Sequence, residues 1–276
     1  MNRYSGAVDS APHPWNTSFE WTPVPRPPAT ISESQAAQYD ELGFFVFEQA
    51  FDASTLERLD SELTPGDEAV RTFLERAPNG RFSVAGLDTQ LVAPHAVLRS
   101  EWVRDFCQHP VLRGIALDIL GAAPRLYWEQ SVYKQPHSVE PVLWHQDNGY
   151  TYVEPQSYLT CWIAITDANR DNGCIAVMPR VHRNGTLLHA TTEIGQECWG
   201  DWECATVVPA RAGDIIVFSS LTPHATFVNA TDDVRKAYIV QYAPDGAEVL
   251  EGDPHLGVAT RRIPQTDPVR QFTVGF

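Results

Sequence analysis

The sequence predicts a mainly β fold in which helices support a jelly-roll core. From Leu126 onward, eight short apolar or alternating runs follow one another, separated by Gly, Pro and Asn-Gly turn signals. Helical patterns instead fill much of residues 32–121. A chain of 276 residues that is 43% hydrophobic can form a sizeable core, and no internal repeat is apparent.

The N-terminal half is expected to hold an arm and four helices. Residues 1 to about 31 are rich in Pro, Ser and Thr and predict an extended arm, of which Trp15 and Trp21 should pack against the body. Ser32 can cap the first helix, with Gln35 completing a capping box and Gly43 ending the helix before the strand "FFVF". The other three helices are predicted in "DASTLERLDSEL", "SEWVRDFCQ" and "PVLRGIALDILG".

The second half supplies the strands. The eight runs are "LYWEQSVYKQ", "VLWHQDNGY", "YLTCWIAIT", "GCIAVMP", "ATVVP", "DIIVFSS", "HATFVNA" and "KAYIVQYA". After the arm, we expect one domain over residues 32–276. It should comprise helical support at about 32–121, a β core at about 126–244 and a C-terminal tail at 245–276.

Composition excludes several function classes. The formal net charge of −15 and the pI near 4.9 argue against nucleic acid and anionic membranes as partners, because both attract clusters of Lys and Arg. The five cysteines contain no Cys-x-x-Cys pair, which argues against a disulfide framework or a zinc knuckle. With no signal-peptide or membrane-spanning pattern, we expect a cytoplasmic protein with no obligatory protein partner.

The segment "WHQDNGY" places His145 two residues before Asp147. If this segment is a strand, both side chains project from the same face. His224 follows the run "GDIIVFSSLTP" and would add a third ligand from another strand. One carboxylate and two imidazoles on one face of an octahedron leave three coordination sites open, which is the geometry of non-haem Fe(II) oxygenases. Any one of these residues alone is more often structural, so the combination carries the prediction.

Arg235 stands eleven residues beyond His224, at the start of "RKAYIVQY". Strand alternation would point Arg235, Ile239 and Gln241 into the barrel. An inward arginine is costly unless it meets an anion. A dicarboxylate that chelates iron at its keto-acid end could bring that anion, and Thr226, on the same face as His224, could donate a hydroxyl to it.

These residues lie within a longer resemblance. From about residue 43 to 244 the chain resembles the phytanoyl-CoA dioxygenase family of Fe(II)/2-oxoglutarate oxygenases, through "HQD", "CWIAITDANRDNGCIAVMP", "HRNG", "GDIIVFSSLTPHATFVN" and "RKAYIVQY". The resemblance implies a double-stranded β-helix with iron on His145, Asp147 and His224. It also implies that 2-oxoglutarate binds at Arg235, Thr226, Trp162 and Gln130.

The resemblance has limits. "PRVHRNG" has Arg180 and Val181 where the family often has Gly-Ser, and His182 is expected to be structural. The lysine that some members place near the co-substrate has no counterpart between residues 85 and 100, where Gln90 and His95 are the candidates.

The implied reaction consumes 2-oxoglutarate and O2, releases succinate and CO2, and most simply hydroxylates a C–H bond of a small organic molecule. Related halogenases lack the triad carboxylate, so Asp147 favours hydroxylation. Desaturation, cyclisation and epimerisation stay open as alternatives. A non-redox metal cupin or a silent binding protein is the alternative from another class, but neither explains Arg235 at this spacing.

Candidate substrate residues follow from alternation and from one long segment. Trp128 shares a face with Gln130, Tyr150 follows the triad motif, and Gln241 lies on the Arg235 strand. Residues 189–205 form a long connection that carries Trp199 and Trp202. We expect this segment to be a lid over the substrate, with burial of both tryptophans in the core as the alternative.

Overall fold

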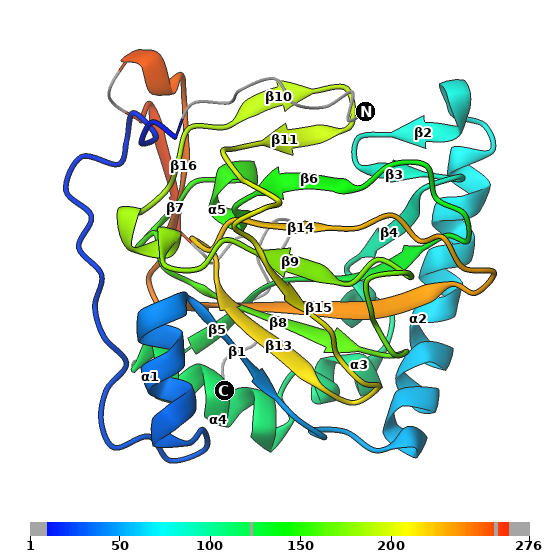
Figure 1. Cartoon of the computed structure of the whole chain (residues 1–276), viewed down its shortest axis with the longest axis horizontal. Helices are drawn as coiled ribbons and strands as arrows, with labels where there is room; N and C mark the ends of the chain where they lie inside the picture. The colour runs from blue at the N-terminus through cyan, green and yellow to red at the C-terminus, as the bar shows by residue number, and fades with distance from the viewer. Residues whose placement is uncertain (1–9, 122–123, 257–258, 265–276) are drawn as a thin grey trace.

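The computed structural model describes residues 10–121, 124–256 and 259–264. Residues 1–9 of the predicted arm, and residues 257–258 and 265–276 of the predicted tail, lie outside this part. Two β-sheets face each other to form the core, and helices lie outside the larger sheet (Figure 1). This is the predicted jelly-roll arrangement with supporting helices.

The four predicted helices are present, and the second is longer than expected. Their bounds are α1 (Glu33–Leu42), α2 (Ala53–Leu74), α3 (Glu101–Phe106) and α4 (Pro110–Leu120). Ser32 and Gln35 form the predicted capping box, and Gly43 ends α1 in the left-handed conformation. The turn signal "TPG" does not end α2, which continues through Pro65. Burial of Leu63 and Leu74 in the main core offsets the backbone hydrogen bond that Pro65 cannot make.

The larger sheet has eight strands, and every neighbouring pair in it is antiparallel. In spatial order the strands are β1 (Phe44–Phe47), β13 (Ile215–Ser219), β8 (Leu159–Ala164), β15 (Arg235–Pro244), β5 (Pro124–Lys134), β4 (Gln90–Pro94), β3 (Ala85–Gly86) and β2 (Arg81–Phe82). The long strand β15 therefore lies between β8 and β5, near the centre of the sheet.

The smaller sheet faces it with four strands. In order they are β12 (Thr206–Val208), β9 (Ile175–Val177), β14 (His224–Thr226) and β6 (Val142–His145). Each of the eight predicted strand runs contributes one strand to these two sheets. Two outer groups complete the described fold: β7 (Val153–Glu154) with β16 (Glu248–Glu251) and β17 (Arg261–Pro264), and the hairpin β10 (Ala190–Thr192) and β11 (Gly195–Glu197).

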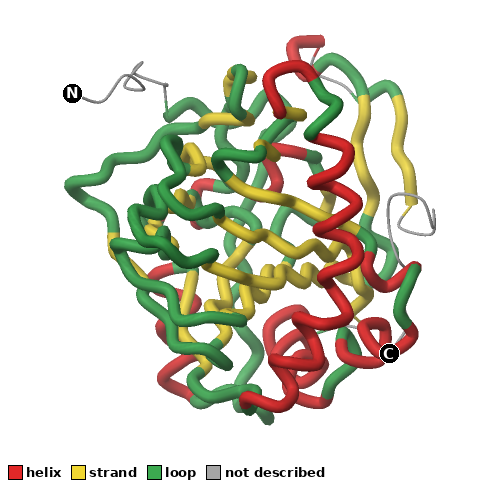
Figure 2. Tube along the Cα trace, turned by 90° about the vertical axis from the view of Figure 1, so that its right-hand side faces the viewer, coloured by secondary structure: helices red, strands yellow, loops and turns green. Residues whose placement is uncertain are grey.

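Alternation along the strands divides the interior into two cores. Cys161 and Tyr238 face outward and pack in one cluster with apolar side chains of α2, α3 and α4, which flank the strands in Figure 2. Trp162 and Ala237 face inward and pack with Ile175 and other residues of the smaller sheet. Because side chains on a strand alternate between its two faces, one strand serves both cores. The inward core fills only part of the space between the sheets.

The described part of the arm packs against the body, as its two tryptophans predicted. Trp15 meets Tyr152 edge-on with ring centroids 5.4 Å apart, and Trp21 meets His182 in the same way at 4.4 Å. His182 is fully buried beside Gly43, where a Cβ would lie 2.5 Å from its Nδ1 atom. Its packing is that of a structural residue, as expected from the sequence.

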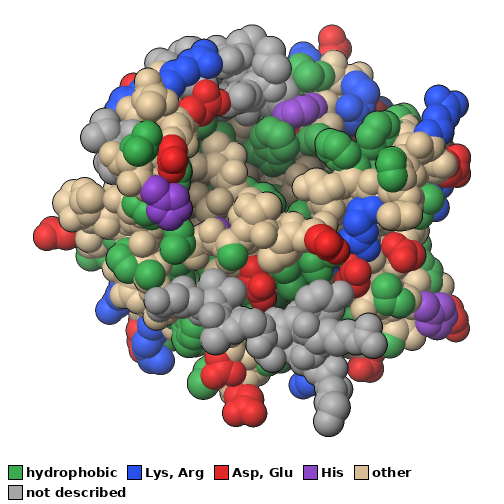
Figure 3. Space-filling view, turned by 90° about the horizontal axis from the view of Figure 1, so that it is seen from above, with side chains coloured by type: hydrophobic (Ala, Val, Ile, Leu, Met, Phe, Trp, Pro, Cys, Tyr) green, Lys and Arg blue, Asp and Glu red, His purple; other side chains and the backbone are tan. Residues whose placement is uncertain are grey.

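No helix within the described ranges has the length and apolar character needed to cross a membrane. On the face shown in Figure 3, acidic and basic side chains are interspersed around a hollow in which hydrophobic side chains are visible. The basic residues on this face do not gather into the stripe that a nucleic-acid surface requires.

Candidate active site

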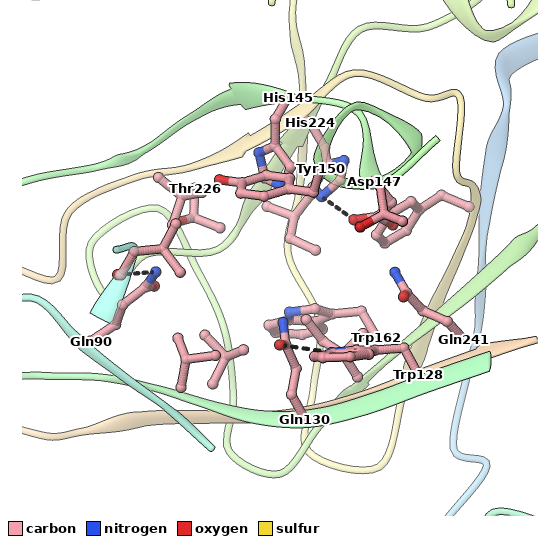
Figure 4. A pocket seen from close by; sticks show the side chains of 18 of the residues that line it. Gln90, Trp128, Gln130, His145, Asp147, Tyr150, Trp162, His224, Thr226 and Gln241 are labelled. Carbon is pink, nitrogen blue, oxygen red and sulfur yellow. Dashed lines mark hydrogen bonds and ion pairs between the residues drawn. The ribbon is translucent and has the colours of Figure 1, made fainter. Parts of the chain in front are cut away.

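A cavity of about 550 Å³ lies between the two sheets. Its smaller-sheet wall carries His145, His224 and Thr226, and its larger-sheet wall carries Trp128, Gln130, Trp162, Arg235 and Gln241. Figure 4 shows the labelled side chains of both walls pointing into the space between them. The residues predicted for iron and co-substrate therefore share one cavity.

Three potential metal ligands converge on the smaller-sheet wall. His145 and His224 are directly paired across β6 and β14, and their ring centroids are 4.1 Å apart. Asp147 Oδ1 lies 3.8 Å from His224 Nε2, and the ligand atoms of all three residues lie within 4.8 Å of one another. Two imidazoles and one carboxylate at this spacing fit a facial metal site with open positions.

Backbone carbonyls fix which nitrogen of each histidine faces the metal position. His145 Nδ1 lies 2.8 Å from the carbonyl of Leu143, and His224 Nδ1 lies 3.0 Å from that of Thr222. A carbonyl only accepts, so each Nδ1 carries the proton and each Nε2 lone pair is left for a metal. Burial and the nearby His224 hold the pKa of His145 well below its usual value, which keeps this ligand neutral.

Asp147 is not on the strand, which corrects the sequence interpretation. β6 ends at His145, and Asp147 begins the helical turn α5 (Asp147–Tyr150). Gln146 is still extended, with φ −104° and ψ 143°, so the strand-like offset between His145 and Asp147 is kept. The chain turns at Asp147, and the side chains immediately before and after Asp147 are anchored by hydrogen bonds.

Gln146 and Asn148 are those anchors. Gln146 is fully buried and donates from Nε2 to the carbonyls of Gly185 and Leu221. Asn148 Nδ2 donates to Thr186 Oγ1. Gly149 completes the motif because a Cβ there would lie 2.2 Å from the ring of His189. The sequence "HQDNGY" thus alternates metal ligands with buried structural residues.

The opposite end of the cavity holds an unpaired cation. Arg235 is 1% exposed, and none of its three side-chain nitrogens has a hydrogen-bond partner among the residues that the structure describes. Its guanidinium carbon lies 5.2 Å from the centroid of the Trp162 ring. Burial lowers the pKa of Arg235 to about 10, so it is charged at neutral pH. A buried guanidinium whose three nitrogens are all unpaired is a site built for an anion.

Lys134 adds a second cation that the sequence interpretation missed. Its buried ammonium group donates to Thr226 Oγ1 at 2.8 Å, and strand register pairs Lys134 with Arg235 on one side and Gln90 on the other. The sequence offered only Gln90 and His95, between residues 85 and 100, as candidates for such a group, whereas Lys134 lies on the neighbouring strand β5. Alternation from the inward Gln130 would have identified it, because Lys134 is four residues farther along the same strand.

The other predicted cavity residues divide into two groups. Trp128, Gln130, Tyr150 and Gln241 line the cavity, as expected. Trp128 Nε1 donates to Gln130 Oε1 at 3.0 Å, and the Tyr150 ring meets the His145 ring edge-on with centroids 5.2 Å apart. The structure therefore supplies an aromatic and amide-lined wall beside the metal position.

Trp199 and Trp202 do not line the cavity, so the expected lid is not formed by these tryptophans. Both pack in a separate cluster with Trp144, Met178 and Ala225, and the Trp144 and Trp202 centroids are 4.8 Å apart. Trp144 precedes His145 on β6 and must face the other side of the sheet. The tryptophans thus cover the outer face of the smaller sheet.

The β10–β11 hairpin of the 189–205 segment reaches a cavity residue. Gln196 of the β10–β11 hairpin donates its backbone N–H to the hydroxyl of Tyr150 at 3.2 Å. After the hairpin, the segment packs closely against Trp144 at Gly200. This approach requires glycine, because a Cβ at Gly200 would lie 2.2 Å from the Trp144 ring. The segment is anchored outside the sheet at its centre and touches the cavity lining at its hairpin.

The convergence of three ligands predicts how metal binding responds to their loss. Each of His145→Ala, Asp147→Ala and His224→Ala should weaken Co(II) binding by roughly 100-fold or more, because even partners outside the coordination shell contribute about 10- to 100-fold. Co(II) titration followed by visible absorption measures this, and circular dichroism checks the fold. His137→Ala, at an exposed histidine, serves as the control. Unchanged Co(II) affinity in Asp147→Ala would contradict the site.

Comparison with known proteins agrees with this geometry. A model of the phytanoyl-CoA dioxygenase (PhyH) family matches residues 39–237. "Phytanoyl-CoA dioxygenase domain-containing protein 1" of Rattus norvegicus is 27% identical over 194 residues, which are 65% of this chain and 66% of that protein. "Methylphosphonate hydroxylase" of Gimesia maris is 27% identical over 225 residues, which are 77% of this chain and 81% of that protein.

Solved structures share the fold. The non-heme alpha ketoglutarate dependent carbocyclase SnoK from nogalamycin biosynthesis has a TM-score of 0.67 and 26% identity, covering 86% of this chain and 95% of that one. The epimerase SnoN, solved with Fe3+ and alpha ketoglutarate, has a TM-score of 0.65 and 21% identity, covering 85% and 95%. With the family match spanning most of the chain and the iron triad assembled in a cavity, this protein belongs to the phytanoyl-CoA dioxygenase family and is an Fe(II)/2-oxoglutarate-dependent oxygenase.

Proposed function

We propose that this oxygenase hydroxylates an unactivated C–H bond of a small or mid-sized uncharged organic molecule. The observation that carries the proposal is a single cavity with two chemically different ends. His145, Asp147 and His224 lie at one end, and the buried, unpartnered Arg235 lies at the other. A five-carbon dicarboxylate suits both ends, because one carboxylate can chelate a metal while the other neutralises the arginine.

The spacing along β14 supports this orientation of the co-substrate. His224 and Thr226 are two residues apart on one face, which corresponds to about 6.6 Å along a strand. Thr226 accepts from Lys134 and keeps its own hydroxyl proton for an anion. Arg235, Lys134 and Thr226 would hold the distal carboxylate, while the ring of Trp162 lies beside Arg235 and shields it from water.

Bound Fe(II) and 2-oxoglutarate supply oxidising power from O2, with succinate and CO2 as the co-products. The chain's own residues provide position and a dry environment. Nε2 of each histidine and Oδ1 of Asp147 face the metal position. Trp128 and Tyr150 flank the remaining space and would orient the substrate while they exclude water.

The lining indicates an uncharged substrate. Among the described residues that line the cavity, the charged groups are Asp147 and Arg235, and both are assigned to the metal and co-substrate. The rest of the wall is aliphatic, aromatic, hydroxyl or amide, including Gln90, Gln130 and Gln241. Such a surface buries rings and chains and offers hydrogen bonds, but it gives no counter-charge to an anion or a cation.

A second candidate is ring closure on the same cofactors. The 26% identity to the carbocyclase SnoK over 86% of this chain favours it. The two outcomes differ in atom balance, because hydroxylation adds one oxygen to the substrate and ring closure removes two hydrogens. Product mass therefore separates them.

The proposed function predicts substrate-stimulated turnover of 2-oxoglutarate. With Fe(II), 2-oxoglutarate and O2, uncharged cyclic organic molecules should increase succinate formation and should gain one oxygen, as measured by mass spectrometry. Asp147→Ala should form no product because it lacks a metal ligand. Products that have lost two hydrogens would exclude hydroxylation and, where they contain no new double bond, would select the second candidate. The absence of any iron-dependent succinate would overturn the proposal.

Removal of the anchor arginine should mainly affect the co-substrate. We expect Arg235→Ala to raise the KM for 2-oxoglutarate roughly thirtyfold or more, because loss of one partner of a desolvated charge pair costs about 2–5 kcal/mol. Succinate formation at varied 2-oxoglutarate measures this, and Co(II) affinity serves as the control that the metal site is intact. An unchanged KM would place the carboxylate anchor elsewhere.

Lys134 should make co-substrate binding depend on pH. Burial and the nearby Arg235 hold the pKa of Lys134 well below its usual value. A bound carboxylate favours the protonated form of Lys134 and raises its pKa. At pH values between the pKa of the free and of the bound protein, binding of 2-oxoglutarate should therefore take up a proton, and its affinity should fall as pH rises. Calorimetry of 2-oxoglutarate in buffers of different ionisation enthalpy measures the uptake. Lys134→Met should abolish it, and equal uptake in that variant would rule out Lys134 as its source.

A further inference from the structure

A chain of hydrogen bonds connects the metal carboxylate with the cavity wall. Thr160 Oγ1 donates to Asp147 Oδ2 at 2.5 Å, and Gln241 Nε2 donates to Thr160 Oγ1 at 3.2 Å. Thr160 on β8 and Gln241 on β15 are direct partners in the strand register. Because the sheet backbone sets this contact, it does not depend on a flexible loop.

The proton count fixes the direction of every bond in this chain. A metal-binding carboxylate is ionised and only accepts hydrogen bonds, so the single hydroxyl proton of Thr160 goes to Asp147. Thr160 must then accept from Gln241, which requires the amide nitrogen of Gln241 to face it. The amide oxygen of Gln241 is therefore left as an acceptor. Gln241 lines the cavity next to Asp147 (Figure 4).

We propose that Thr160 and Gln241 position the metal carboxylate and select a substrate that carries a hydrogen-bond donor. Thr160 occupies Oδ2 of Asp147, which leaves Oδ1, 3.8 Å from His224 Nε2, to bind the metal through one oxygen. Gln241 Oε1 accepts a hydroxyl or N–H group of the substrate. The second half rests on the proposed function, whereas the first depends only on the metal site.

The surroundings of Gln241 support a recognition role. Its side chain is 7% exposed, and Thr160 is 1% exposed, so water competes weakly with a bound substrate. Trp128 on β5 is paired with Gln241 on its other side, and both line the cavity. A ring that lies against Trp128 can thus present a hydroxyl to Gln241. A molecule that offers only acceptors would leave the Gln241 oxygen unpaired.

Metal binding tests the positioning half without turnover. Thr160→Val keeps the side-chain shape but loses the hydroxyl, and we expect it to weaken Co(II) binding about 10- to 100-fold. Thr160→Ser should restore wild-type affinity, and Thr206→Val, at an exposed threonine of β12, should not change it. Should Thr160→Val fail to fold, Thr160→Ala gives the same comparison. Wild-type Co(II) affinity in a folded variant without the hydroxyl overturns this half.

A panel of uncharged cyclic alcohols, each beside its methyl ether, tests the recognition half. With the iron- and 2-oxoglutarate-loaded enzyme, we expect kcat/KM for stimulated succinate formation to be about tenfold higher for an alcohol than for its ether. Gln241→Met should remove this preference and, because Gln241 acts on Asp147 only through Thr160, should weaken Co(II) binding less than Thr160→Val does. Ethers that stimulate as well as their alcohols, or a panel in which no alcohol stimulates, overturn the donor requirement.

The Co(II) binding experiment and the alcohol and ether experiment together distinguish failure of this inference from failure of the proposed function. If the wild-type enzyme forms no succinate at all, the proposed function fails, while Co(II) binding still reports on Thr160. If succinate forms and ethers serve as well as alcohols, the proposed function stands and the recognition role of Gln241 fails.

Discussion

The burial of Arg235 and Lys134 without a counter-ion is the constraint on which the cavity depends. Removing an ionised group from water costs several kcal/mol unless a partner of opposite charge is present. Within the described part of the chain, Arg235 has no hydrogen-bond partner, and Lys134 has the hydroxyl of Thr226 and the like charge of Arg235 as its neighbours. Both residues are held in place by the pairing of β15 with β5 in the larger sheet. An anion that enters the cavity relieves the cost, so affinity for a carboxylate is built into the fold.

Strand register fixes the positions of the anion-binding residues relative to the metal ligands. β15 carries Arg235 at one end of its inward face and Gln241 at the other, and β14 carries both His224 and Thr226. The anion end and the metal end are thereby fixed relative to each other by two rigid strands, one from each sheet. The site residues on β14 and β15 are therefore positioned by backbone pairing between strands, which few side-chain substitutions can change.

The two faces of the smaller sheet have different roles: one carries the metal-binding histidines, and the other packs against tryptophans. His145 and His224 face the cavity, whereas Trp144 and Ala225 face outward and are covered by Trp199 and Trp202. The aromatic cover lies on the face of the smaller sheet that points away from the cavity. The expectation of a tryptophan lid assigned these residues to the wrong face, because a long connection can pass over either side of a sheet and its sequence does not say which.

The sequence by itself determined the strands, the helix caps and the metal ligands, because alternation, capping and the His-x-Asp motif are local patterns. Alternation also identified Arg235, Trp128, Gln130 and Gln241 as inward residues, since it fixes which side of a strand each side chain occupies. Only the tertiary structure decided that Asp147 begins a helical turn, that Lys134 lies beside Arg235, and that Gln241 reaches Asp147 through Thr160. Thr160 and Gln241 are 81 residues apart in the chain. Their contact follows from the choice and register of neighbouring strands, and that pairing is set by the packing of the whole sheet, which no local pattern encodes.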